Sequence, residues 1–418
     1  MDNIQTRNNA DNTEYKLTVF SCFCGIFVQA IVSNLVAILF IPLMKIYNLD
    51  YVHLGMLVGI NFISQVSSDI IFSRLIDKTG FKKLVLPAIA LSFAGLLLFS
   101  LSPYLFENIL TGLIIATIVF SMASGLLEVL LSPIVSAIPN DNKGPAMSLM
   151  HSFYAWGQVV TIIFTTFLLF ILGNNYWQLI VLLWCVIPVI NFFMFLNAKF
   201  PPMVEEHSRL TMRDLIFKPF YMMALLAILF GGASEVIVNQ WSSTFMEKGL
   251  RLPKFAGDLL GMCGFSVMLG LGRVIFGIWG SKMNLQKILM WSSLLAVVCY
   301  ITIALSPIVS VNIIACMLCG LAVSLLWPGA IVMSAEKYPL AGGWMFAILA
   351  AAGDIGAAIG PWSTGMIIDF SKNSKIVAFI STFLNISTEQ GAMRFALLLA
   401  GIFPLMCFFS HKILSKFK

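Results

Sequence analysis

Long apolar runs, separated by short polar connections, fill most of the chain. Each run is long enough for a helix that crosses about 30 Å of hydrocarbon at about 1.5 Å per residue. Twelve such helices are predicted, at 17–43, 53–76, 84–103, 109–138, 145–172, 176–196, 219–245, 258–280, 288–307, 311–335, 343–369 and 392–411. The sequence therefore predicts an all-α membrane protein with twelve transmembrane helices.

The composition supports this assignment. Of the 418 residues, 59% are hydrophobic and 11% are charged, whereas soluble domains carry about 25% charged residues. Too little length remains between the spans for a soluble catalytic or nucleic-acid-binding domain. The sequence has no ATP-binding loop of the form G-x4-G-K-S/T and no metalloprotease motif, so we expect neither an enzyme nor a bound cofactor. We also expect no metal site, because Cys316 and Cys319 lack a second pair of ligands.

Positive charges indicate the orientation of the spans. The connections on the side of both termini hold 17 Lys and Arg residues, against seven on the other side. Cationic loops are typical of the cytoplasmic side. We therefore expect a multi-pass protein of the cell membrane with both termini in the cytoplasm.

The spans fall into two sets of six. A polar connection at 197–218 separates a predicted N-terminal bundle, 1–196, from a C-terminal bundle, 219–418. The pattern G-L-x3-L-L-x-P begins at Gly125 in span four and again at Gly320 in span ten, 195 residues later. Parallel duplication of six-helix units is typical of transporters whose two halves rock around a central site; chance similarity among Gly- and Leu-rich spans is the alternative.

The loop after span two has the sequence Asp77-Lys78-Thr79-Gly80-Phe81-Lys82-Lys83. It resembles the signature loop of the major facilitator superfamily, and with the layout of six plus six spans the resemblance covers nearly the whole chain. It implies two pseudo-symmetric six-helix bundles that transport a solute by alternating access. Because an Asp at a helix end can cap a neighbouring helix and Gly allows a tight turn, Asp77 and Gly80 are expected to hold one conformation of the transporter.

A second resemblance lies in spans four and five. The segments Gly125–Pro133 and Met147–Gly157 are similar to the fucose permease group of sugar–proton symporters. This implies a role for Glu128 in proton coupling and a position for His151 near the sugar. The chain differs from that group in span one, where Val36 and Ala37 follow Asn34-Leu35 in place of an acidic stretch.

Ionisable side chains inside the spans cost about 2.5–3.5 kcal/mol each on insertion scales, which favours a function for them. Counted along the helices, Asp69, Arg273 and His151 fall in a layer about 10 Å from the cytoplasmic ends. The proton-coupling candidates Glu128, Glu235 and Asp354 fall nearer the midplane.

Arg273 is expected to pair with Asp69 or Asp354, either as a gate or as a packing contact. Glu128, with no cation at its depth, is expected to be neutral and to take up a proton; a protonated Glu bonded to a helix carbonyl is the alternative.

Amide and aromatic side chains near the midplane are the candidates for binding the solute. A flat apolar ring beside hydrogen-bonding groups suits a pyranose, although each of these residues could equally serve packing. The candidates are Gln29, Asn34, His151, Trp156, Gln158, Asn239, Gln240, Trp241 and Trp327.

The sequence thus favours a secondary active transporter of a small polar, sugar-like solute that is coupled to protons. Proton-driven efflux of amphipathic compounds is an alternative, because 22 Met residues could line an adaptable cavity. A sensor that kept the fold without transport is another. The expected partners are the solute, protons and the lipid bilayer; the chain is expected to be a monomer that binds no nucleic acid.

Overall fold

The structure, a computed structural model, describes residues 15–138, 143–201, 215–338, 341 and 343–417. Among these residues, twelve helices are long and apolar enough to cross a membrane. The prediction of an all-α fold with twelve spans is confirmed. Most of the predicted connection at 197–218 lies outside the described residues.

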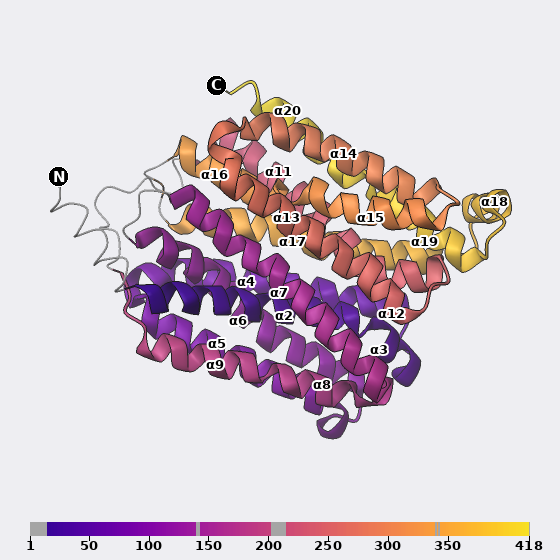
Figure 1. Ribbon diagram of the computed structural model, residues 1–418, viewed down its shortest axis with the longest axis horizontal. Coiled ribbons are helices and arrows are strands. Elements are labelled where there is room, and N and C mark those ends of the chain that lie inside the picture. The colour runs from indigo at the N-terminus through magenta and orange to yellow at the C-terminus, as the bar shows by residue number, and fades with distance from the viewer. Residues whose placement is uncertain (1–14, 139–142, 202–214, 339–340, 342, 418) are drawn as a thin grey trace.

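The N-terminal half forms the lower part of the molecule in Figure 1. Its helices are α2 (Lys16–Ile38), α3 (Phe40–Tyr47), α4 (Tyr51–Thr79), α5 (Phe81–Leu105), α6 (Ile109–Ala137), α7 (Lys143–Leu172), α8 (Trp177–Trp184) and α9 (Val186–Asn197), with the short turn η1 (Asn174–Tyr176) before α8.

The C-terminal half lies above it in the same view. It begins with α11 (Pro219–Thr244), η3 (Phe245–Gly249), α12 (Lys254–Ala256), η4 (Gly257–Cys263), α13 (Gly264–Trp279) and η5 (Gly280–Lys282). It continues with α14 (Leu285–Leu305), α15 (Val309–Val323), α16 (Leu326–Lys337), α17 (Gly343–Ser371), α18 (Lys375–Leu384), α19 (Thr388–Ala400) and α20 (Ile402–Leu414).

The spans run roughly parallel to the long axis, so the molecule has two ends. Helix α2 begins and α20 finishes at the left of Figure 1, which we call the terminal end. There Thr18, on the first turn of α2, donates a hydrogen bond to the carbonyl of Lys199, just after α9. The opposite end, which we call the far end, carries α3, α12 and α18.

Four spans are interrupted, and in each a proline explains the break. Pro42, Pro188, Pro328 and Pro404 lie in the first turn of α3, α9, α16 and α20. Proline has no N–H to donate to the carbonyl four residues earlier. The helix therefore breaks between that carbonyl and the proline, whereas the predicted spans were continuous at all four positions.

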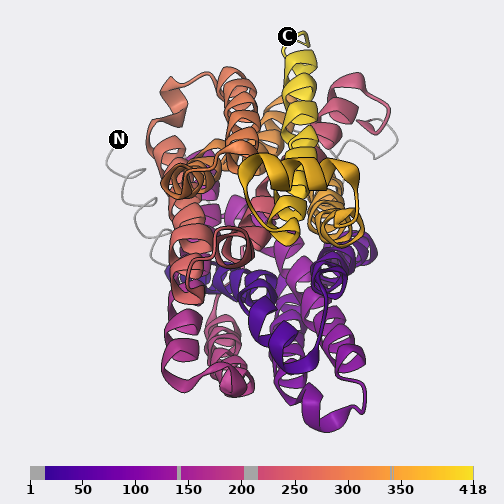
Figure 2. The same cartoon turned by 90° about the vertical axis from the view of Figure 1, so that its right-hand side faces the viewer.

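Helix α18 was not predicted. Its ten residues are too few to cross a membrane, and the sequence analysis counted the whole segment between the spans 343–369 and 392–411 as one outer connection. Phe379 and Phe383 stack on each other, with ring centroids 6.1 Å apart, and both are exposed. In Figure 2, which looks at the far end, this helix lies across the spans and not along them.

Polar contacts join the two halves at the far end. The Tyr51 hydroxyl donates to Glu389 at 2.6 Å, and the backbone N–H of Val52 donates to Asp369 at 3.0 Å. Lys45 also pairs with Glu247 across the halves at 3.4 Å. In this structure the halves are therefore closed against each other at the far end.

A further contact between the halves lies just inside the far end. Thr166 on α7 donates to the buried carboxylate of Asp258 at 2.9 Å. Ser243 and Lys254 donate to the same carboxylate. Asp258 was not among the predicted residues, because it stands at the start of a span beside Lys254, which the sequence analysis treated as a loop cation.

Candidate functional site

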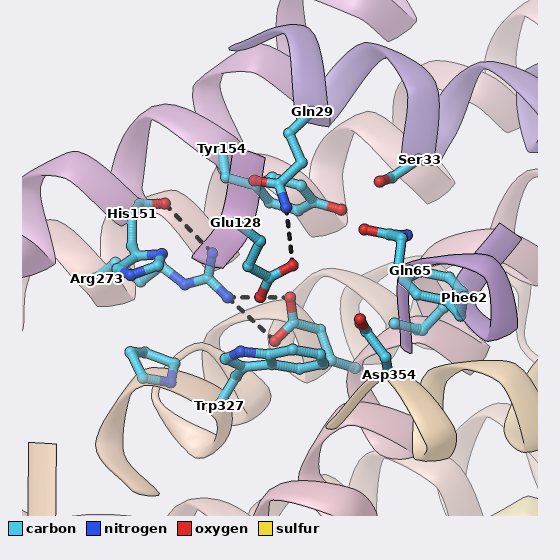
Figure 3. A pocket seen from close by; sticks show the side chains of 13 residues that line it. Gln29, Ser33, Phe62, Gln65, Glu128, His151, Tyr154, Arg273, Trp327 and Asp354 are labelled. Carbon is cyan, nitrogen blue, oxygen red and sulfur yellow. Dashed lines mark hydrogen bonds and ion pairs between the residues drawn. The ribbon is translucent and has the colours of Figure 1, made fainter. Parts of the chain in front are cut away.

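A cavity of about 550 Å³ lies between the two halves at mid-depth. Figure 3 shows polar side chains from both halves pointing into it. The lining residues are Gln29, Ser33, Phe62, Gln65, Glu128, His151, Tyr154, Glu235, Val236, Arg273, Trp327, Pro328 and Asp354. Seven of these are predicted site residues, which come from seven different helices and meet at one place.

Arg273 and Glu235 form a buried ion pair on the side of the C-terminal half. One guanidinium nitrogen of Arg273 donates to both carboxylate oxygens of Glu235, at 3.0 and 3.1 Å. A second nitrogen donates to the backbone carbonyl of His151 on α7, at 3.4 Å. The pair thus lies in the C-terminal half and also contacts the N-terminal half.

The break before α16 helps to orient Arg273. Pro328 has no N–H, so the carbonyl of Ser324, four residues earlier, lacks its usual helical donor. Arg273 Nε donates to that carbonyl at 3.0 Å. Gly272 allows the approach, because a Cβ at this position would lie 2.2 Å from Ser324 Oγ. A proline and a glycine in the sequence therefore position the guanidinium.

We expected Arg273 to pair with Asp69 or Asp354, but the ion pair that it forms is with Glu235. Nor is Glu128 remote from a cation, because Arg273 lines the same cavity. The physical reason is that the predicted layers counted Cα positions, whereas the long Arg side chain carries its charge well away from its own backbone.

Glu128 lies on α6 and faces the cavity. It accepts a hydrogen bond of 2.8 Å from the side-chain amide of Gln29 on α2. Both residues were predicted, one for proton coupling and the other for solute binding. The structure brings them into direct contact, as Figure 3 shows.

Trp327 provides an aromatic surface of the cavity beside Asp354 (Figure 3). Its ring lies between two helices that glycine allows to come close. A Cβ at Gly232 would lie 2.8 Å from this ring, and a Cβ at Gly353 would lie 2.6 Å from it. Gly353, next to the predicted residue Asp354, thus has a packing role together with Gly232, which is to make room for the indole.

His151 is shared by the linings of the main cavity and two smaller ones. It lines cavities of about 340 and 380 Å³ as well as the main one. Its Nε2 lies 3.5 Å from Ser132 Oγ. The smaller cavities are also lined by Pro133 and Val332, which lie closer to the terminal end of α6 and α16. The two smaller cavities therefore lie on the terminal-end side of the main one.

Four of the predicted solute-binding residues form an amide cluster beside the cavity instead of lining it. The side-chain oxygen of Asn34 accepts from Gln158 at 2.9 Å and from Asn239 at 2.8 Å. Gln240 donates to the backbone carbonyl of Ser33 at 3.1 Å. The amide cluster joins α2 and α7 to α11, and it lies on the far-end side of Gln29.

Two predicted tryptophans lie in helix contacts. Trp241 is buried, donates to the carbonyl of Pro361 at 3.1 Å and packs on Phe40 with ring centroids 5.4 Å apart. Trp156 lies between α7 and α13, where a Cβ at Gly270 would be 3.5 Å from its ring. Neither lines the main cavity in this conformation.

The two predicted residues of the signature loop lie at the terminal end. Gly80 adopts φ +87° and ψ 153° at the start of α5. This is a conformation that side chains with a Cβ rarely adopt. The side chain of Asp77 lies outside the described residues, so its expected capping role stays a prediction.

Sequence reasoning missed several lining residues. Tyr154 follows His151 by one helical turn within the segment that carries the family resemblance, so helical spacing could have identified it. Ser33, Phe62 and Gln65 carry no such signal, because their types are common in membrane helices. Among the described residues, no group of three His, Cys, Asp or Glu side chains is placed to hold a metal ion.

Comparisons with known proteins agree with this geometry. The model of the Major Facilitator Superfamily matches residues 22–361. No curated protein matches the sequence.

Among solved structures, a bacterial homologue of the human lysosomal transporter Spinster, in an inward-facing and occupied conformation, is 11% identical, with a TM-score of 0.74 and 96% of each chain covered. The E. coli fucose:proton symporter FucP is 15% identical, with a TM-score of 0.67 over 96% of this chain and 99% of that one. The proton:xylose symporter XylE is 13% identical, with a TM-score of 0.76 over 97% and 96%. At such identities the likeness is one of fold.

Proposed function

The chain belongs to the major facilitator superfamily, and from that premise we propose that it is a secondary active transporter that carries a small, polar, sugar-like solute together with protons. The solute would bind in the main cavity. The two halves would expose that cavity to one side of the membrane and then to the other. With the terminal end in the cytoplasm, as the positive charges of the sequence favour, the far end closed in this structure would be the outer one.

The excess of carboxyl groups around the cavity carries the proposal of proton coupling. Glu128, Glu235 and Asp354 line the cavity, and Arg273 is the one guanidinium among the lining residues. A single positive charge offsets at most one carboxylate. Ionised groups in a low-dielectric interior are costly unless paired, so protons are the simplest way to neutralise the others.

Two features support a sugar-like solute. Trp327 offers a flat apolar face, and Gln29, Gln65 and Glu128 offer hydrogen-bonding groups within the same cavity. A pyranose ring can pack one face on an indole while polar side chains around its edge form hydrogen bonds with its hydroxyls. Two of the solved structures with this fold are described as fucose:proton and proton:xylose symporters, which adds support from fold alone.

The test is solute flux in proteoliposomes that contain the purified protein. A panel of radiolabelled monosaccharides and of amphipathic cations is offered with and without an imposed proton gradient. We expect at least one sugar to accumulate only when the gradient is present, and the uptake to alkalinise the external solution. Expulsion of the amphipathic compounds would support the efflux alternative. If no solute moved, whereas a known symporter reconstituted in parallel was active, transport would be contradicted and a sensor favoured.

A further inference from the structure

Two carboxyl groups from opposite halves face each other inside the membrane. Asp69 on α4 and Asp354 on α17 are 0% and 1% exposed. Their side chains lie close enough to interact with each other. Asp69 is ten residues from the terminal end of α4 and Asp354 eleven from the start of α17, which places both about 15 Å inside the bundle at 1.5 Å per residue.

The two helices adjoin closely on the far-end side of this pair. A Cβ at Gly55 would lie 3.2 Å from the carbonyl of Pro361, and a Cβ at Gly59 would lie 3.4 Å from Trp362. Nearer the far end, Val52 of α4 is bonded to Asp369 of α17. We call this boundary between α4 and α17 the seam. Because its far-end part is fastened by these contacts, the seam can separate most easily from the terminal end.

Within the described part of the chain, neither oxygen of Asp69 has a hydrogen-bond donor, and Oδ2 of Asp354 also lacks one. The polar side chains next to Asp69 in the sequence form hydrogen bonds with other groups. Gln65 donates to Asn61 at 2.7 Å and accepts from Ser124 at 3.0 Å. Ser68 donates to the carbonyl of Met122 at 2.7 Å.

The charged groups around the pair also fail to supply a donor. Glu128 on α6 is a further acid that lies near both carboxyls. Glu235 on α11 is bound to Arg273 of α13. His151 on α7 faces the same cavity, with its ring nitrogen near Ser132. The contact between Asp69 and Asp354 is therefore one between two acids, next to a third.

Two carboxylates cannot hydrogen-bond to each other, because each can only accept. In a medium of low dielectric constant, their charges would also repel strongly at contact distance. One proton removes both difficulties, since the protonated carboxyl donates to the ionised one. A hydrogen bond of this kind, between O–H and a carboxylate, is among the stronger ones in proteins.

We propose that Asp69 and Asp354 form a proton-binding site shared by the two halves, in which one proton holds the seam closed at this depth. When the halves separate from the terminal end, water reaches both carboxyls and the shared proton leaves to the solvent. The ionised pair then opposes closure of the seam. This inference rests on the proposed function for the rocking of the halves, but not for the solute or for the role of Glu128.

The test measures conformation without any solute. Spin labels at Lys83→Cys and Glu336→Cys, both exposed near the terminal end in opposite halves, report how far the halves are separated there. Pulsed electron resonance is recorded in nanodiscs from about pH 5 to about pH 9, which spans the range where a shared buried carboxyl proton titrates. We expect the population to shift from short to long distances as the pH rises.

The Asp69→Asn variant shows whether the shift with pH comes from the shared proton or from the titration of another group. Its amide can donate to Asp354 without a titrating proton, so the short distance should persist at all pH values. Asp354→Asn should behave in the same way, which gives a second reading if one variant folds poorly. Glu128→Gln is the matched control, a neighbouring acid replaced by its amide, and should keep a shift with pH.

The outcomes separate the two proposals. If both Asn variants kept the wild-type shift with pH, or if only Glu128→Gln removed it, the shared site would be overturned, whatever the solute is. A distance that did not depend on pH in the wild-type protein would overturn it as well. If the shift behaved as expected but no solute were transported, the shared site would stand and the proposed function would fail.

Discussion

Arg273 binds both carboxylate oxygens of Glu235, at 3.0 and 3.1 Å, in the interior of the membrane protein. Arg273 is the one guanidinium among the residues that line the cavity, and its charge neutralises that of a single acid, Glu235. Glu128 and Asp354 line the same cavity. The account of proton coupling given above follows from this imbalance between acids and the single cation.

Breaking the pair should destabilise the protein. Glu235→Gln leaves a buried guanidinium without its counter-charge, which costs on the order of 3–5 kcal/mol. The melting temperature of the purified protein in detergent should fall clearly. The double variant Arg273→Met with Glu235→Leu should recover part of that loss, because it buries no unpaired charge, but it should not transport.

The control for this prediction is the pair at the far end. Lys45 is 53% exposed in its contact with Glu247, and exposed ion pairs contribute about 0–1 kcal/mol. Glu247→Gln should therefore change the melting temperature little. Equal losses for Glu235→Gln and Glu247→Gln would contradict the assignment of Arg273 and Glu235 as a strongly coupled buried pair.

The orientation in the membrane is testable by labelling. Lys282 is exposed at the terminal end and Asn175 at the far end. An impermeant maleimide added to intact cells should label Asn175→Cys at once, and Lys282→Cys only after the membrane is permeabilised. The eight native cysteines are buried or partly buried, so the protein without an introduced cysteine gives the background. The reverse pattern of labelling would place the terminal end outside the cell.

Gly80 offers a prediction with a closely matched control. Gly80 has φ +87° and ψ 153°, Gly173 has φ +88° and ψ 163°, and each precedes a helix. Neither would bring a Cβ within 4 Å of another group. Replacement by Ala therefore costs backbone strain alone, of order 1–3 kcal/mol at each site.

Both variants should lose similar stability, but only Gly80→Ala should slow transport, because Gly80 lies in the loop expected to hold one conformation. Rates of solute exchange in proteoliposomes measure this. Equal rates for Gly80→Ala and Gly173→Ala would leave the signature loop without the conformational role predicted for it.

The contact between Tyr51 and Glu389 should control opening of the far end. Tyr51→Phe removes a hydrogen bond of 2.6 Å between the halves. Bonds to charged groups contribute about 1.5–3 kcal/mol, so the far-open population should rise about tenfold or more. Spin labels at Glu107→Cys and Lys375→Cys, both exposed at this end, measure the change.

Tyr300→Phe is the control for that prediction. Its hydroxyl donates to the carbonyl of Ser234 at 2.8 Å within the C-terminal half. The loss of this bond should lower stability without changing the distance between the halves. A similar distance change in both variants would mean that general loosening, and not the Tyr51 contact, governs the far end.

The fold was largely predictable because its physical cause is simple. Apolar runs of crossing length set the twelve spans, but which prolines break a span could not be predicted, because Pro133 and Pro361 lie inside the unbroken helices α6 and α17. Helix α18 was missed because the analysis searched for runs of crossing length, and its ten residues cannot cross a membrane. Arg394 was counted as a loop cation, yet it is buried and donates to the carbonyl of Ser306 at 2.7 Å.

The site was only partly predictable. The cost of burying charge singled out Glu128, Glu235, Asp354 and Arg273, and the structure gathers all four around one cavity. Which acid Arg273 binds could not be predicted, because that depends on how α13 is rotated and on the free carbonyl of Ser324. The position of the amide cluster beside the cavity depends in the same way on helix packing, which spacing along the chain does not reveal.

The most direct test of proton coupling is the Glu128→Gln variant in proteoliposomes, measured for two activities on a solute that the wild-type protein transports. Glutamine mimics a protonated glutamate that cannot release its proton. We predict that the variant exchanges labelled for unlabelled solute, but does not accumulate it under a proton gradient. Glu336→Gln, an exposed acid on α16, should retain both activities. Accumulation by Glu128→Gln at the wild-type level would contradict the central claim that this carboxyl couples the solute to protons.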